Sequence, residues 1–121
     1  MPHCIFEYSA NIADDPDWPQ LVKQIHERLV STGLFIAEDI KSRILKREHF
    51  VIGHGEPNQS FVTLSLQILE GRSDEVKREL SQMALDVLAP AFPKSIANQK
   101  FSITVQVTEI HRASYQRRVN Y

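Results

Sequence analysis

Residues 61–69 read FVTLSLQIL, and apolar and polar side chains alternate along this stretch. Successive side chains of a β-strand point to opposite faces of its sheet. One face of this strand therefore carries only the aliphatic side chains of residues 62, 64, 66 and 68, and the other carries Thr63, Ser65 and Gln67. The pattern predicts a strand with one face against a hydrophobic core.

A helix is predicted directly after this strand. Ser73 is a favourable N-cap residue, and apolar residues then recur at spacings of three and four. Pro90 and Pro93 indicate that the helix ends near Ala89 or shortly after, because proline lacks the N–H that a helix interior needs. The expected buried stripe consists of Val76, Leu80, Met83, Ala84, Val87, Leu88 and Ala91.

The N-terminal half shows the same order of elements. A strand is predicted over residues 3–8, and Asp17 is the expected N-cap of a helix that ends before Gly33. A second strand is predicted over residues 40–45, and a turn-rich stretch follows at residues 53–58. The apolar stripe of this first helix consists of Trp18, Leu21, Val22, Ile25 and Leu29.

With a last alternating stretch over residues 101–107, the order is strand–helix–strand twice. Each half is long enough for a βαβ unit. We expect one α/β (α+β) domain over residues 1–121, with units at about 2–47 and 60–110 and a polar tail at 111–121. Two folds fit this order, a ferredoxin-like sandwich and a pair of βαβ units related by a pseudo-twofold axis.

Composition excludes several classes of protein. The 121 residues include 14 Lys and Arg against 15 Asp and Glu, so there is no overall basic field to attract nucleic acid. A single cysteine excludes an intrachain disulfide, and no apolar stretch reaches membrane-spanning length. His49 and His54 match no common zinc spacing, so no metal site is predicted. The first 20 residues contain no Lys or Arg, unlike a signal peptide, and we expect a cytoplasmic protein.

Pro2 is a candidate general base. Met1 precedes a small residue, a context in which the methionine is normally removed, and the chain would then begin with the secondary amine of Pro2. Such an amine can accept a proton when its pKa is lowered toward neutrality. The alternative is an incidental proline, because proline makes up about 5% of average composition.

Three basic residues are candidates for binding an anionic substrate. Arg72 lies between a predicted strand and a predicted helix, at the sheet edge where α/β proteins bind ligands, and its guanidinium can hold a carboxylate through two hydrogen bonds. Lys41 and Arg43 are two residues apart in a predicted strand and share one face. The alternatives are a solvated loop arginine and a charged edge strand that resists aggregation.

Short motifs occur in a fixed order along most of the chain. They are MPHCIFEYS at 1–9, Asn11-Ile12, TGLF at 32–35, Ser42-Arg43, Gly71-Arg72-Ser73 and Glu109-Ile110-His111. In this order and spacing they resemble the 5-carboxymethyl-2-hydroxymuconate Δ-isomerase family of the tautomerase superfamily. The resemblance implies two βαβ units in a tautomerase-like fold, and a homotrimer in which strands of adjacent subunits complete one another's sheets. It also implies a cofactor-free isomerase of aromatic-acid catabolism.

The resemblance assigns roles to four residues. It implies that Pro2 is the base and that Arg72, Arg43 and Lys41 bind a carboxylated dienol of the 5-carboxymethyl-2-hydroxymuconate type. Relatives tend to have Arg-Ser-Arg where this chain has Lys41-Ser42-Arg43, and lysine cannot make a fork-shaped clamp on a carboxylate. The alternatives are a non-catalytic ferredoxin-like oligomerisation or ligand-binding module and a tautomerase for another enol or keto acid.

Overall fold

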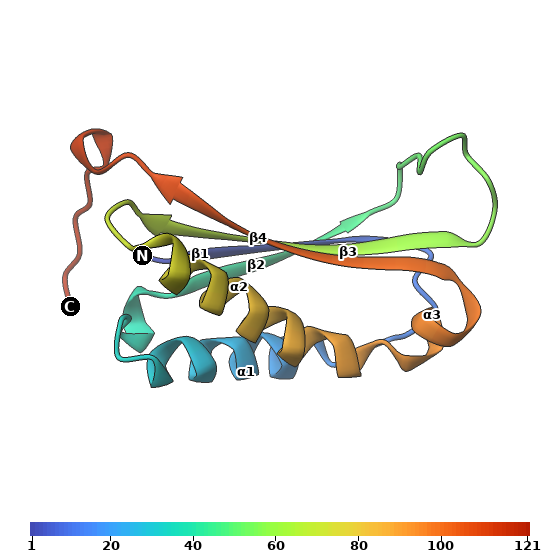
Figure 1. Ribbon diagram of the computed structural model, residues 1–121, viewed down its shortest axis with the longest axis horizontal. Coiled ribbons are helices and arrows are strands. Elements are labelled where there is room, and N and C mark those ends of the chain that lie inside the picture. The colour runs from blue at the N-terminus through green and yellow to red at the C-terminus, as the bar shows by residue number, and fades with distance from the viewer.

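A four-stranded sheet forms one layer of the molecule, and the long helices form a second layer on one of its faces (Figure 1). The computed structural model describes all residues from Met1 to Tyr121. The strands are β1 (His3–Ser9), β2 (Lys41–Arg47), β3 (Gln59–Leu69) and β4 (Lys100–Ile110). The α-helices are α1 (Trp18–Ser31), α2 (Asp74–Leu88) and α3 (Pro93–Asn98), and the short 3-10 helices are η1 (Ala37–Asp39), η2 (Ala89–Ala91) and η3 (Arg112–Ser114).

The order of strands in the sheet is β2-β1-β3-β4. β1 pairs with β2 in parallel, β3 pairs with β4 in parallel, and the two central strands pair antiparallel. In a ferredoxin-like fold, a strand of the other unit separates the two parallel strands of each βαβ unit. Here the two strands of each unit are neighbours, so the ferredoxin-like alternative is wrong and the pseudo-twofold pair of βαβ units is confirmed.

The core lies between the sheet and the two long helices. Residues 62, 64, 66 and 68 of β3 are at most 1% exposed, as the alternation in the sequence predicts. The helices pack against them through two buried stripes, Leu21, Val22, Ile25 and Leu29 of α1 and Leu80, Ala84 and Leu88 of α2. No helix covers the other face of the sheet (Figure 1), and none of the helices is long and apolar enough to cross a membrane.

Two elements differ from the sequence prediction for local physical reasons. β2 runs to Arg47, beyond the predicted residues 40–45, because an edge strand tolerates polar residues and Arg47 pairs with Glu7 at 2.9 Å. α3 is absent from the prediction. Its first N–H groups are bound by a distant residue, since the Asp14 carboxylate accepts hydrogen bonds from the backbone of Lys94 and Ser95.

Asp17→Ala is expected to lower the free energy of unfolding by about 1 kcal/mol, the usual value of an N-cap side chain. The Asp17 carboxylate accepts a hydrogen bond from the Gln20 backbone N–H at 3.2 Å and closes the first turn of α1. Urea unfolding of the variant measures the change. Asp17→Asn keeps an acceptor and should restore most of the stability, and the exposed neighbour Asp15, changed to alanine, is the matched control.

Candidate active site

The N-terminal end of β1 is the place where sequence-predicted site residues meet. Pro2 is buried, and its carbonyl oxygen accepts a hydrogen bond from the backbone N–H of Lys41 at 3.1 Å. This bond continues the pairing of His3 with Lys41, which opens the parallel ladder of β1 and β2. The first βαβ crossover therefore returns the chain directly to Pro2 and places Lys41 beside it.

The amino group in this structure is that of Met1, and it lies against η1. It donates a hydrogen bond to the Asp39 carbonyl oxygen at 3.2 Å. Burial lowers the pKa of this amine, the cations of Arg117 and Lys41 lower it further, and the Asp39 carboxylate opposes them. While Met1 is attached, the Pro2 nitrogen belongs to a resonant amide and is not basic. An amine at the end of β1 is thus partly buried and lies near the cations of Arg117 and Lys41.

Lys41 is held in position by three acceptors. Its ammonium donates to the carbonyl oxygens of Glu38 at 2.9 Å and Asp39 at 3.4 Å, and to the Tyr121 hydroxyl at 2.8 Å. It also lies 5.3 Å from the centroid of the Tyr121 ring. An ammonium group has three protons, so all three have partners here.

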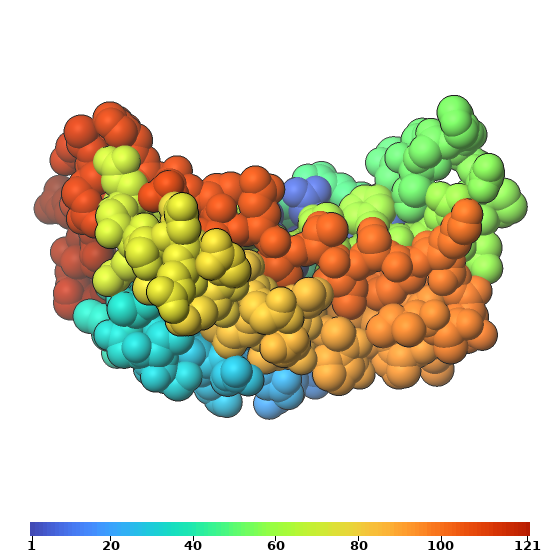
Figure 2. Space-filling view, viewed as in Figure 1, coloured from blue at the N-terminus to red at the C-terminus, as the bar shows by residue number.

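The tail after η3 folds back onto η1, which sequence reasoning missed. Arg117 pairs with Asp39 at 3.0 Å, and this hydrogen bond lowers the pKa of the Asp39 carboxyl. The Asp39 side chain is only 15% exposed. Figure 2 shows the tail against the segment that contains η1. The tail sequence YQRRVNY has no periodicity from which this position can be predicted.

Arg43 lies on the open face of the sheet beside β1. Its guanidinium donates a hydrogen bond to Nδ1 of His3 at 3.2 Å. Because arginine can only donate, Nδ1 of His3 is the acceptor and carries no proton. Burial lowers the pKa of His3, and the nearby Arg43 lowers it further, so the neutral ring is favoured. Arg43 therefore lies at the same end of the sheet as Pro2, hydrogen-bonded to His3.

Arg72 reaches this end of the molecule from the second βαβ unit. β3 runs antiparallel to β1, and Gln67 pairs with His3, so the loop after β3 lies at the end of the sheet where Pro2 lies (Figure 1). Gly71, with φ of +120°, turns the chain there. The Arg72 side chain is exposed and is not part of any ion pair of the chain. No ion pair joins Arg72 to the residues around Pro2.

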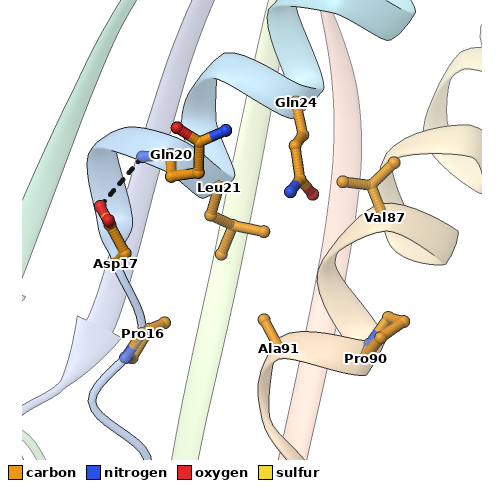
Figure 3. Close-up of a pocket in the computed structure, with 8 residues that line it drawn as sticks. All are labelled: Pro16, Asp17, Gln20, Leu21, Gln24, Val87, Pro90 and Ala91. Carbon is orange, nitrogen blue, oxygen red and sulfur yellow. Dashed lines mark hydrogen bonds between the residues drawn. The ribbon is translucent and has the colours of Figure 1, made fainter.

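Two open cavities of about 470 Å³ flank the folded-back tail, one beside Lys41 and Tyr121 and the other beside Asp39 and Arg117. A separate cavity of about 380 Å³ opens between α1 and α2 (Figure 3). It is lined by apolar and amide side chains, and its one carboxylate, Asp17, caps α1. Charged groups suited to binding a carboxylate therefore gather at the end of β1 rather than between the helices.

Comparisons with known proteins identify the family of the chain. Residues 2–121 match the model of the family described as 5-carboxymethyl-2-hydroxymuconate isomerase. The 5-carboxymethyl-2-hydroxymuconate Delta-isomerase of Escherichia coli is 27% identical over 111 residues, which cover 92% of this chain and 88% of that protein.

Two solved structures show the same fold. A 5-carboxymethyl-2-hydroxymuconate isomerase from Deinococcus radiodurans R1 superposes with a TM-score of 0.89 at 27% identity, covering 98% of this chain and 90% of that chain. A fused 4-OT described as a symmetric trimer superposes with a TM-score of 0.71 at 12% identity, covering 92% of this chain and 87% of that chain. The chain therefore belongs to the 5-carboxymethyl-2-hydroxymuconate isomerase family, and it is an isomerase with a tautomerase fold.

Proposed function

We propose that this isomerase moves a proton within a carboxylated 2-hydroxymuconate-type dienol, with Pro2 as the general base once Met1 is removed. The substrate named by the family, 5-carboxymethyl-2-hydroxymuconate, is the one we expect. The observation that carries the proposal is the setting of the terminal amine. Burial, Arg117 and Lys41 lower the pKa of the Met1 amine, which adjoins Pro2, and the Asp39 carboxylate opposes them. We expect the amine of Pro2 to meet the same groups once Met1 is removed.

In the proposed reaction, neutral Pro2 takes the proton of the 2-hydroxyl group. The electron pair of the broken O–H bond forms the carbonyl, and the conjugated double bonds shift along the chain. Protonated Pro2 then returns the proton to a distant carbon, so no proton is gained or lost overall. A base suits this work when its pKa lies near the working pH. A free secondary amine is too basic for that, and burial together with neighbouring cations would lower its pKa in the required direction.

Arg72, Arg43 and Lys41 are proposed to bind the carboxylates of this substrate. Arg72 is exposed and free of ion pairs, so its guanidinium is available for a bidentate contact. Lys41 provides a point charge where relatives tend to have an arginine, whose guanidinium can make two hydrogen bonds to a carboxylate. Charge that develops on the dienolate oxygen would be stabilised by the same cations.

We further propose a homotrimer. The face of the sheet opposite the helices is uncovered in the single chain, with Thr63, Ser65 and Gln67 on it (Figure 1), and the fused 4-OT with the same fold is described as a symmetric trimer. Light scattering of the purified protein measures the oligomeric state directly.

We also propose that the activity belongs to the catabolism of aromatic acids, as the family resemblance implies.

The proposal is tested by ultraviolet assay with a panel of 2-hydroxymuconate-type dienols, before and after alkylation of the terminal amine. Intact mass of the same sample establishes whether Met1 is absent. We expect isomerisation by the chain that begins at Pro2 and its loss on alkylation. Full activity of a sample that quantitatively retains Met1 would contradict the role of Pro2.

Arg117→Gln is expected to raise the pH at which kcat/KM reaches half of its maximum. The groups around the amine are Asp39, Lys41, Arg117 and His3. Removing the Arg117 cation makes the protonated amine more favourable, and it also leaves the Asp39 charge without its partner, so both effects raise the pKa of the base. A pH–rate profile measures the shift. Arg118→Gln makes the same change of charge one residue away and should leave the profile in place.

A further inference from the structure

We propose that Tyr121 determines substrate specificity, because its hydroxyl holds the place on Lys41 that a second substrate carboxylate must take. This inference rests on the proposed function, in which Lys41 binds a carboxylate. The role of Tyr121 does not follow from the predicted base or the predicted basic residues. It follows from the way the segment Arg117–Tyr121 folds onto η1 and reaches Lys41.

The first step is the count of partners of Lys41. Two of its three protons point to the backbone carbonyl oxygens of Glu38 and Asp39. These acceptors are part of the backbone and are present whether or not a substrate is bound. The third points to the Tyr121 hydroxyl at 2.8 Å, the distance expected for a charged donor and an oxygen acceptor. An incoming carboxylate oxygen needs this third proton.

The second step is the way Tyr121 is fixed. Its hydroxyl oxygen also lies 3.1 Å from the Glu38 carbonyl oxygen and 3.2 Å from the Asp39 carboxylate, one of which takes its proton. The Arg117–Asp39 pair anchors the same segment at 3.0 Å. The side of the Tyr121 residue away from this contact is open, since the residue is 63% exposed. The phenol is therefore placed by specific bonds, yet it is not locked in by packing.

This contact weakens the binding of substrates with a second carboxylate and leaves the binding of other substrates unchanged. A substrate with a second carboxylate must displace the phenol before it can reach Lys41. A substrate without that carboxylate leaves Lys41 paired with Tyr121, so no buried or bound charge loses its partner. Tyr121 thus narrows the preference for doubly carboxylated substrates over singly carboxylated ones.

The test compares Tyr121→Phe with Tyr115→Phe, a tail tyrosine outside this hydrogen-bond network. For a dienol with two carboxylates, Tyr121→Phe should lower KM about 3- to 10-fold, the range of one net hydrogen bond, with kcat unchanged. For the enol of phenylpyruvate, which has one carboxylate, the variant should leave KM unchanged. Tyr115→Phe should leave both substrates unchanged.

Binding of glutarate, followed by calorimetry, separates this inference from the proposed function. Glutarate should bind Tyr121→Phe about 3- to 10-fold more tightly than the parent protein, and the difference should vanish when Lys41→Met is added to both. Equal glutarate binding by the parent and Tyr121→Phe, a raised KM, or an effect that survives Lys41→Met would overturn the role of Tyr121. Absence of isomerisation together with the expected glutarate difference would reject only the proline mechanism and support the phenol as the competitor for Lys41.

Discussion

Pro2→Ala should lower kcat/KM for the dienol about 10²-fold or more, within the range that a positioned general base contributes. Alanine leaves a primary amine at the same place, so some activity should remain. The proline ring fixes the direction of the nitrogen lone pair, whereas the amine of alanine can rotate. The amine of alanine is subject to the same burial and the same cations, but its unperturbed pKa differs from that of proline. Steady-state kinetics on samples whose mass shows the loss of Met1 give the ratio.

Pro19→Ala is the matched control for this result. Pro19 is exposed in the first turn of α1 and is not part of the β1–β2 pairing beside Pro2. Circular dichroism and urea unfolding of both variants separate a lost base from a lost fold, because Pro2 is buried and its ring packs in the folded state. Undiminished kcat/KM in a Pro2→Ala protein that lacks Met1 would reject Pro2 as the base.

The fold is largely predictable from sequence because its elements are amphipathic. Residues 62–68 alternate strictly and lie in β3 with their aliphatic side chains inward. Ser73 and Asp17 cap the two long helices as expected, since N-cap chemistry is local. Strand order cannot be derived from such local patterns, because it depends on which strands pair in the folded chain. The pattern of elements allows two orders, the family resemblance favours the pair of βαβ units, and the structure confirms that order.

The candidate site is predictable only in part for the same reason. The neighbourhood of Lys41 and Pro2 follows from a βαβ unit, whose second strand returns beside the first. The pairing of Arg117 with Asp39 and of Tyr121 with Lys41 joins residues about 80 positions apart. No periodic pattern marks them, and each becomes visible only when the tail is seen to fold onto η1. The free guanidinium of Arg72 is likewise a property of its loop rather than of its neighbours in sequence.

Arg72→Ala should lower kcat/KM about 10²-fold, the loss seen when one donor to a developing negative charge is removed. The guanidinium comes from a loop that Gly71 turns toward the end of the sheet, and it has no partner within the chain to compensate for its loss. The distribution between kcat and KM is informative. A contact made equally in the ground state raises KM alone, whereas a contact that strengthens as the dienolate forms lowers kcat.

Arg72→Lys sharpens this prediction because it keeps the charge and removes the fork. If Arg72 holds a carboxylate through two hydrogen bonds, lysine should recover only part of the lost kcat/KM. Arg78→Ala removes an exposed arginine from α2 and should leave kcat/KM unchanged. An Arg72→Ala protein with the kcat/KM of the parent would remove Arg72 from the site. The carboxylates of the substrate would then be bound by Lys41 and Arg43 alone, and both lie in the first βαβ unit.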